Sequence, residues 1–305
     1  MNILVCISNV PDTTSKINFV ENDTKFDTNG VQYIINPNDE FGLTKAVWMK
    51  ESHSANVTVL TVGDQSTEPT LRKCLAIGAD KAIRINGNAK DGCSVAKEIA
   101  HFCKNEKFDL IICGRESIDY NGGVVAGVIA GILDYNFITN CVNLDIKGSN
   151  AEASREIDGG IETLECNLPL VLGAQKGLVE ESDLIIPNMR GIMMARQKPL
   201  ETIEAQNFEA ESQNISYQKP DAKQEVKLVK PDDIDKLIDW LRTYPRLTKG
   251  ELTVEFEKQW AKFIGTRHSV FVNSGSSANL LMLYTLMEAG KLKKGDTVIV
   301  PAVSW

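Results

Sequence analysis

A glycine-rich turn between a buried strand and a helix is the part of this sequence best suited to bind a phosphate group. The apolar run 110–113 predicts the buried strand, and the polar residues 115–121 predict the turn. Gly122 and Gly123 then open a small-residue apolar segment, which predicts a helix that ends near Leu133. The N–H groups at the start of a helix are unpaired and carry partial positive charge, so they attract anions. The same spacing also fits a tight turn that packs the helix closely on the sheet, and spacing alone leaves both interpretations open.

Composition and charge exclude several classes of function. The chain has 305 residues, about the length of two domains, and a formal net charge of -8 without a basic stripe. This balance argues against a nucleic-acid partner. The longest apolar run, 124–133, is too short to span a membrane, so we expect no direct membrane insertion. The first residues run directly into a strand, so we expect no signal peptide.

Cysteines and histidines indicate neither a metal site nor a disulfide framework. The seven cysteines are scattered without a CxxC pair, which predicts reduced, mostly buried thiols and a cytoplasmic location. His53, His101 and His268 lie far apart in the sequence, without other metal-binding side chains beside them. We therefore expect no metal centre.

Strands and helices alternate along the first part of the chain and would position the glycine-rich turn. The predicted strands are 3–7, 57–61, 82–85 and 110–113, and the predicted helices are 40–50, 69–77, 93–104 and 122–133. This alternation predicts an α/β fold, a doubly wound, Rossmann-like parallel sheet with helices on both faces. Such sheets bind ligands beyond the carboxyl ends of their strands.

The pattern changes at Phe137. Short alternating strands are predicted at 141–146, 153–157 and 162–168. Glycine-rich turns separate them, which indicates a β-meander appended to the sheet. Residues 201–230 are polar and low in apolar content, which predicts an extended, loosely packed arm.

Residues 1 to about 240 resemble the beta (small) subunit of electron transfer flavoproteins. The main signature is residues 153–164, ASREIDGGIETL, in which a basic residue precedes an acid-Gly-Gly turn and a glutamate, and Pro169 and an apolar strand follow. Gly173 departs slightly from the family, which has Thr, Ala, Cys or Ser after that strand. Further matches are Asn36-Pro37 before the first long helix, the glycine-rich turn itself, and residues 187–189 and 193–196.

The resemblance implies an electron carrier rather than an enzyme. The chain would pair with an alpha subunit and share with it a redox-active FAD. It would accept electrons from acyl-CoA dehydrogenases or other flavin dehydrogenases and pass them to a quinone oxidoreductase. It would also bind a structural AMP, or a second FAD as in electron-bifurcating relatives, and the resemblance leaves that choice open.

The resemblance also implies which residues surround this nucleotide. They are Cys6, Asn36, Pro37, Asn38, Asp39, Val62, Asp119, Tyr120, Asn121, Gly122, Gly123, Val124, Val125, Ala126, Gly127, Val128, Ile129 and Ala130. Gly122, Gly123 and the N–H groups after them would hold the phosphate. Asn36 or Asp39 would bond the base or the ribose, or would only cap the following helix. Many relatives carry Gln, Thr or Gly where this chain has residues 124–126, so we expect phosphate contact through the backbone.

The loop 175–187 is similar to the recognition loop of the family, whose leucine inserts into an apolar pocket of partner dehydrogenases. Leu178 stands among acidic residues in this loop, and its distance from Pro187 matches the family. We therefore expect Leu178 to be exposed and to dock on the dehydrogenase. Burial of such a side chain contributes about 1.5–3 kcal/mol, which suits a transient contact.

From about residue 244 the chain resembles a different family, the pyridoxal-phosphate (PLP) sugar aminotransferases of the DegT/DnrJ/EryC1/StrS type. Helices at 254–264 and from 273 onwards, and strands at 268–272 and 298–300, are predicted. Gly275, Ser276 and Ser277 match the positions that bind the cofactor phosphate at a helix start, and Trp305 matches the position that stacks on the pyridine ring. The Schiff-base lysine of that family is expected beyond residue 305. We therefore expect an incomplete fold-type-I fragment without transaminase activity.

We expect three regions: a nucleotide-binding domain over 1–200, an arm and junction helix over 201–243, and the aminotransferase fragment over 244–305. Residues 230–243 fit a terminal helix in both families, which suggests that recombination or an assembly error fused two genes there. Strands of the fragment would keep unpaired edges, so we expect local helices without defined packing. Two other functions stay open, a truncated PLP aminotransferase and a stand-alone adenine-nucleotide-binding module.

Overall fold

The computed structural model describes residues 1–220, 235, 238–239, 242–243 and 250–297. The chain forms two compact units, Met1–Pro220 and Asp221–Trp305. Most of the helix expected at 230–243, the strand expected at 298–300 and Trp305 lie outside the described residues.

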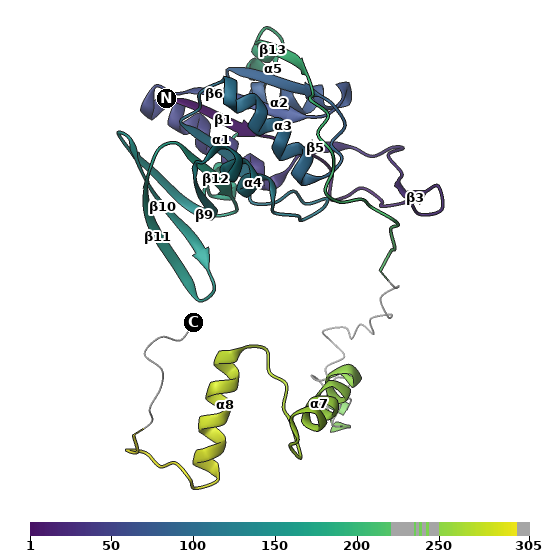
Figure 1. The fold of residues 1–305 in the computed structure, drawn as a ribbon, viewed down its shortest axis with the longest axis vertical. Coiled ribbons are helices and arrows are strands. Elements are labelled where there is room, and N and C mark those ends of the chain that lie inside the picture. Colours follow the sequence, from purple (N-terminus) through teal and green to yellow (C-terminus); the bar gives the residue numbers. More distant parts are fainter. Residues whose placement is uncertain (221–234, 236–237, 240–241, 244–249, 298–305) are drawn as a thin grey trace. The chain divides into compact units, whose positions relative to one another are not determined.

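A nine-stranded sheet forms the centre of the first unit (Figure 1). Its strands are β1 (Asn2–Cys6), β6 (Asn56–Val62), β7 (Lys81–Asn86), β8 (Leu110–Gly114), β9 (Asn136–Lys147), β10 (Asn150–Ile157), β11 (Gly160–Asn167), β12 (Leu170–Ala174) and β13 (Leu200–Glu204). Their order across the sheet is β11-β10-β9-β12-β8-β1-β6-β7-β13. All neighbours from β9 to β13 in this order pair in parallel, whereas β9, β10 and β11 pair antiparallel. The predicted parallel sheet with an appended meander is therefore confirmed.

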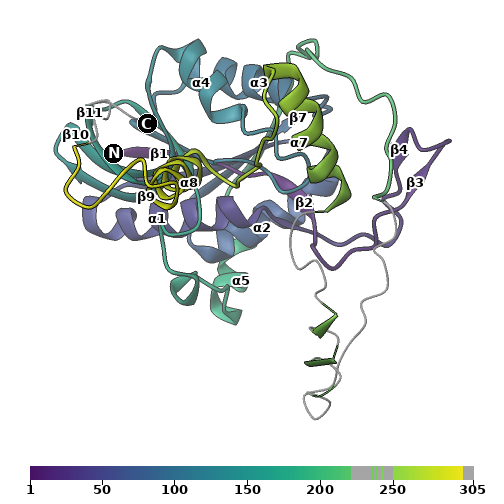
Figure 2. The same cartoon turned by 90° about the horizontal axis from the view of Figure 1, so that it is seen from below.

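Helices cover both faces of this sheet. They are α1 (Pro37–His53), α2 (Glu68–Ile77), α3 (Gly92–Asn105), α4 (Val125–Leu133) and α5 (Met189–Ala195). Figure 2 shows α3 and α4 over one face and α1, α2 and α5 over the other. The side chains of β1 alternate between these faces, because Ile3 and Val5 belong to the core of one face and Leu4 to that of the other. Burial on both faces explains why the predicted strands are continuous apolar runs.

The chain between β1 and α1 adds two small antiparallel pairs at the edge of the first unit. β2 (Asn9–Pro11) pairs with β5 (Tyr33–Ile35), and β3 (Phe19–Val20) pairs with β4 (Lys25–Phe26). The β3–β4 hairpin projects from the unit in Figure 1.

Residues 201–219 of the expected arm pack on the first unit, so the expectation of loose packing is wrong for these residues. Its first residues form β13, which pairs in parallel with β7 and closes one edge of the sheet. Ile203 of β13 packs against the core under α3 and α4. Residues 206–219 then run on to the β3–β4 hairpin, held by hydrogen bonds to α3 and to that hairpin. Their polar side chains and backbone supply these bonds, which a hydropathy pattern does not register.

The second unit contains the helices α7 (Glu251–Ile264) and α8 (Gly275–Glu288), as the sequence predicts. The strand expected at 268–272 is wrong, because these residues form no strand and Phe271 instead donates its N–H to the carboxylate of Glu257 (2.9 Å). A strand needs a neighbour to pair with, and the described residues of this unit provide none. Leu252 is 88% exposed and Phe263 80% exposed, so the unit lacks a closed core over its described part. Within the described ranges, no helix is long and apolar enough to cross a membrane.

Candidate nucleotide-binding site

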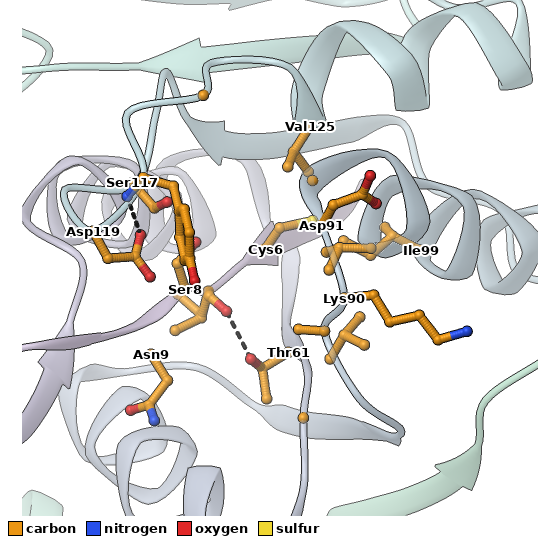
Figure 3. Close-up of a pocket in the computed structure, with 18 of the residues that line it drawn as sticks. Cys6, Ser8, Asn9, Thr61, Lys90, Asp91, Ile99, Ser117, Asp119 and Val125 are labelled. Atoms are coloured by element: carbon orange, nitrogen blue, oxygen red, sulfur yellow. Dashed lines mark hydrogen bonds between the residues drawn. The ribbon is translucent and has the colours of Figure 1, made fainter. Parts of the chain in front are cut away.

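A cavity of about 1320 Å³ lies beyond the carboxyl ends of β1, β6, β7 and β8 (Figure 3). β1 lies at the point where the chain changes direction across the sheet, since β6 and β7 follow on one side and β8 and β12 on the other. Open α/β sheets bind ligands at such a switch point. The cavity exceeds the roughly 300–1,000 Å³ usual for drug-sized ligands, so it has room for a mononucleotide or a dinucleotide.

The structure brings half of the predicted site residues to the wall of this cavity. Those that line it are Cys6, Asp39, Val62, Asp119, Tyr120, Gly122, Gly123, Val124 and Val125. Those that do not are Asn36, Pro37, Asn38, Asn121, Ala126, Gly127, Val128, Ile129 and Ala130. Half of the predicted residues therefore share one cavity, those of α4 after Val125 lie outside its lining, and nucleotide binding there stays a prediction.

The later residues of α4 are expected to surround the nucleotide, but the structure does not place them in the wall of the cavity. The N–H of Val128 already donates to the carbonyl oxygen of Val124 (3.0 Å), and Ile129 and Ala130 are buried in the core. Only the first turn of a helix has N–H groups without an intrahelical partner. Ala126 and Gly127 thus remain relevant through their backbone N–H groups alone.

Asn36 forms a clamp inside the protein and is not available to a ligand. It is fully buried, its Nδ2 donates to the Glu116 carbonyl (3.0 Å), and its Oδ1 accepts the N–H of Ile118 (3.1 Å). These bonds hold the turn after β8 in place. Asn36 is the N-cap residue of α1, but its side chain makes no capping bond. The predicted contact with base or ribose and the alternative side-chain cap are both wrong for this residue.

Asp39 joins the ends of the two central strands. One carboxylate oxygen accepts the N–H of Ser8 after β1 (2.7 Å), and the other accepts the N–H of Gly114 at the end of β8 (2.8 Å) and Nδ2 of Asn36 (3.0 Å). A Cβ at position 114 would lie 2.2 Å from Oδ1 of Asp39, so only glycine allows this approach. Burial raises the pKa of Asp39 to about 7, although these donors favour the charged form.

Three of the helix starts at this edge of the sheet carry an aspartate. Asp39 lies in the first turn of α1, and Asp64 caps the short helix η1 (Gln65–Thr67) before α2 by accepting the N–H of Ser66 (2.8 Å). Asp91 caps α3 by accepting the N–H of Ser94 (2.7 Å) in a capping box. Carboxylates thus already cap the starts of η1 and α3, and α1 carries an acid in its first turn.

The start of α4 is different, because it has no acid in its first turn and no side-chain cap. Its N-cap residue is Val124, and it lines the cavity together with Val125. Gly123 before it has φ +62°, which turns the backbone and favours glycine. Of these four helix starts, α4 alone has neither an acid in its first turn nor a side-chain cap, which suits an anion in the cavity.

The loop between β7 and α3 and the end of the arm also line the cavity, although neither is among the residues predicted from the sequence. Lys90 and Asp91 line the cavity from this loop, and Glu211, Ser212 and Asn214 line it from the arm. Figure 3 shows Lys90 and Asp91 on the side of the cavity opposite Asp119. The polar, glycine-containing stretch 86–92 after a strand is a signal for the loop, since it has the same strand-turn-helix form as the glycine-rich turn. The sequence of the arm has no local pattern that indicates a position beside the cavity.

The expectation that Leu178 is exposed is wrong, because its side chain is buried. Its side chain is 5% exposed and belongs to the core under α1 and α2. The acidic neighbours suggested exposure, yet the turn after β12 directs Leu178 inward. Ile186 and Met189, at the end of the same segment, are 83% and 75% exposed. Ile186 is thus the large apolar side chain that the loop presents to solvent, and Met189 follows in α5, where Ile192, Met193 and Met194 are also exposed.

In the second unit, the start of α8 coincides with the predicted phosphate-binding residues. Gly275, Ser276 and Ser277 form its first turn. The Ser274 hydroxyl caps the helix by accepting the N–H of Ser277 (3.1 Å). The hydroxyl of Ser277 donates to Oδ1 of Asn273 (2.7 Å). The helix start is therefore confirmed, and PLP binding there stays a prediction.

An open α/β sheet with a large cavity at its switch point is the architecture of a nucleotide-binding domain. Residues 23–207, more than half of the chain, match the electron transfer flavoprotein domain. The electron transfer flavoprotein subunit beta of Bacillus subtilis is 37% identical, over 70% of this chain and 83% of the relative. The subunit beta proteins of Syntrophomonas wolfei (30%, over 79% and 96%) and Bos taurus (32%, over 67% and 82%) are also similar. The chain belongs to the electron transfer flavoprotein family.

A second family matches the end of the chain. Residues 229–305 match the DegT/DnrJ/EryC1/StrS aminotransferase family. The resemblance to a fusion of two families is therefore confirmed, and the second match begins before residue 244, where the fragment is expected to start.

Proposed function

We propose that this chain is the beta subunit of an electron transfer flavoprotein and that its cavity holds the adenosine 5′-phosphate part of a nucleotide. AMP and FAD share that part. The observation that carries the proposal is the uncapped start of α4, which faces a cavity at the switch point of a sheet whose family is known. The phosphate would accept N–H groups of Val125, Ala126 and Gly127.

The residues around the cavity suit this ligand. Val95 and Ile99 of α3 and Val62 of β6 offer apolar contacts for a base, and Ser66 and Asn86 offer polar groups for a ribose. No side-chain carboxylate caps α4, so a phosphate there meets the positive end of the helix directly. The cavity volume admits either AMP or a second FAD, and the choice between them is an outcome of the test.

In this proposal the chain works as half of a heterodimer with an alpha subunit. A FAD shared with that subunit supplies the redox chemistry when bound, and this chain supplies binding and orientation. Electrons would come from acyl-CoA or other flavin dehydrogenases and pass to a quinone oxidoreductase. The electron transfer flavoprotein subunit beta relatives support the role of electron carrier, as opposed to enzyme.

The bound nucleotide tests the proposal directly. The full chain is co-produced with an alpha subunit, purified and denatured, and the released nucleotides are separated and quantified. We expect one adenine nucleotide per chain in addition to the shared FAD. AMP identifies a structural nucleotide, and FAD identifies a second flavin site. A heterodimer that releases no adenine nucleotide beyond the shared FAD contradicts the proposal.

Docking of the dehydrogenase would use the exposed end of the segment after β12. Ile186 and Met189 are exposed there, and an apolar anchor of this kind contributes most of its energy when it leaves water. We expect Ile186→Ala to slow dehydrogenase-dependent reduction about tenfold without loss of nucleotide, as measured by stopped-flow absorbance of the flavin. Leu178→Ala is the matched comparison. It should instead destabilise the fold by about 2–5 kcal/mol, as a buried leucine does.

For residues 229–305 we propose no transaminase activity in this chain. The third residue of α8, Ser277, already bonds the Ser274 hydroxyl through its N–H, which leaves fewer donors for a cofactor phosphate. Added PLP should give no absorbance band typical of an aldimine. A band that borohydride reduces would contradict this proposal and favour the aminotransferase function.

A further inference from the structure

The arm after β13 forms one wall of the cavity. Its residues 205–214 run along α3, and Glu211, Ser212 and Asn214 line the cavity. Polar contacts fasten this segment at both ends, although most of its side chains are exposed. A wall made of one chain segment is easier to detach than a strand or helix in a core.

The first fastening is a buried carboxylate of α3. Glu98 is 6% exposed, and its two oxygens accept the N–H groups of Gln206 (2.9 Å) and Phe208 (3.2 Å). A buried carboxylate is costly unless such donors satisfy it, so the arm and Glu98 depend on each other.

The second fastening is Asp91, which joins the arm to the start of α3. One of its oxygens caps the helix through Ser94, and the other accepts the N–H groups of Glu211 (2.8 Å) and Ser212 (2.9 Å) and the Ser212 hydroxyl (3.1 Å). These hydrogen bonds, with that of Ser94 first, lower the pKa of Asp91, so it stays charged at neutral pH. Lys97 of α3 adds an ion pair with Glu211.

The far end of the arm is held by an aromatic cluster. Tyr217 stacks on Phe19 of the β3–β4 hairpin, with ring centroids 4.8 Å apart and an interplanar angle of 10°. Nδ2 of Asn214 donates to the hydroxyls of Tyr217 (2.9 Å) and Tyr120 (3.3 Å). Tyr120 lines the cavity, so this cluster connects the arm to the glycine-rich turn on the other side.

We infer that residues 205–214 are a detachable wall that retains the adenine nucleotide, and that Glu98 and Asp91 set how fast the nucleotide leaves. This inference rests on the proposed function. The nucleotide dissociates when the arm detaches from α3, because detachment opens the cavity between α3 and the glycine-rich turn. By thermodynamic reciprocity, the bound nucleotide must stabilise the attached arm to the same extent.

The test compares Glu98→Gln with Glu106→Gln in the full chain. A glutamine keeps the size of Glu98 but offers one acceptor oxygen where two N–H groups point. Glu106 is exposed at the end of the same helix and serves as the matched control. Dissociation of radiolabelled AMP is followed after addition of excess unlabelled AMP. Arm detachment is followed independently by cleavage after Glu209 and Glu211 with a glutamate-specific protease, identified by mass spectrometry.

We expect Glu98→Gln to speed both AMP dissociation and cleavage about tenfold, and Glu106→Gln to match the parent chain. AMP should slow cleavage in the parent. If Glu98→Gln speeds cleavage and AMP still dissociates at the parental rate, the arm does not retain the ligand and the inference is wrong. If Glu98→Gln changes neither rate, the double variant Glu98→Gln/Asp91→Ala removes both fastenings of the arm, and parental AMP dissociation there overturns the inference. A parent chain that binds neither AMP nor FAD contradicts the proposed function itself, before any variant is compared.

Discussion

α3 and α4 begin side by side at the same edge of the sheet, but their first turns are built in opposite ways. The two starts are close enough that a Cβ on Gly92 of α3 would lie 2.8 Å from the Val124 side chain of α4. α3 has Asp91 as its cap, and this carboxylate is fully used by Ser94 and by the arm. α4 has Val124 at the same position, and no side chain of its N-cap residue caps the first N–H groups of the helix.

A helix start is open to an external anion only where the protein has not already matched it with a carboxylate. A glycine-rich sequence alone does not reveal this, since both loops contain glycine. The absence of an acid or hydroxyl at the cap of α4 is the informative feature. Four predictions test how the helix starts at this edge of the sheet differ.

The largest effect should come from giving α4 the cap that α3 has. Val124→Asp places a carboxylate where it accepts N–H groups of the first turn, so the phosphate meets both a filled helix start and a negative charge. We expect AMP affinity to fall at least about 100-fold, while the free energy of unfolding is unchanged or rises by about 1 kcal/mol. Isothermal titration calorimetry with AMP measures the affinity. The neutral Val124→Asn is the matched control and should lose less, and equal losses in both variants would show that charge is not the cause.

The converse change removes the cap of α3. Asp91→Ala loses a helix cap, worth about 0.5–2 kcal/mol, and also the three bonds to the arm, so we expect about 2–3 kcal/mol of lost stability. Urea denaturation followed by circular dichroism gives the free energy of unfolding. Asp64→Ala removes a cap without an arm contact and should cost about 1 kcal/mol. Equal losses in the two variants would contradict the double role of Asp91.

A third prediction uses Asp39, the aspartate at the start of α1. Its pKa is about 7 in the folded chain against about 3.9 in an unfolded one, so between these values the folded state binds the additional proton. Stability from this group is therefore greatest at low pH and is lost as pH rises. From pH 5 to pH 7 the free energy of unfolding should fall by about 2 kcal/mol because of Asp39.

The variant Asp39→Asn isolates this contribution. It should be less stable than the parent, since its NH2 group would face the N–H of either Ser8 or Gly114, but its stability should change less over the same pH range. Urea denaturation at pH 5, 6 and 7 measures the slope. An unchanged slope in the variant would assign the pH dependence to another group.

The smallest effect concerns the turn that places α4. Gly123 has φ +62°, so Gly123→Ala should cost about 1–2 kcal/mol of stability through backbone strain. Gly122→Ala is a close control, because a Cβ there has nothing within 4 Å and no left-handed backbone is required. Thermal unfolding of both variants measures the difference. Similar melting temperatures for the two would show that the turn does not need a glycine.

The two units of the chain differ in a comparable way in their packing. In the first unit, β1 is covered on both faces and paired on both edges, so Leu4 and Ile3 are fully buried. In the described part of the second unit, α7 and α8 have no sheet to cover, and Leu252 and Phe263 stay exposed. Both units have apolar side chains of the same kinds. Within the described residues, however, only the first unit has a sheet that these side chains can cover.

Much of the fold was predictable from local pattern. Continuous apolar runs gave β1, β6, β7 and β8, and Gly78 marked the end of α2. The strand expected at 268–272 failed because a β-prone run forms a strand only when another strand pairs with it. β13 was missed for the opposite reason, since its polar residues Glu201, Thr202 and Glu204 conceal an edge strand whose partner is β7.

The candidate site was predictable only in part. The glycine-rich turn and the ends of β1 and β6 follow from the α/β pattern and the family resemblance. Leu178 and Ile186 show the limit, because the sequence places both in one segment and the fold buries the first and exposes the second. Exposure depends on which face of the chain meets the core, and a short irregular segment has no periodicity that reveals it.

By itself, the sequence determined the alternation of strands and helices, the family of the first part, and the position of the glycine-rich turn. These are properties of local pattern and of sequence similarity. The tertiary structure decided which helix start is unfilled, since Asp39, Asn36 and Asp91 are bonded to partners 75 to 120 residues away. It also decided that residues 205–214 form a wall of the cavity, because the bonds from Glu98 and Asp91 reach backbone groups that carry no signal in the sequence.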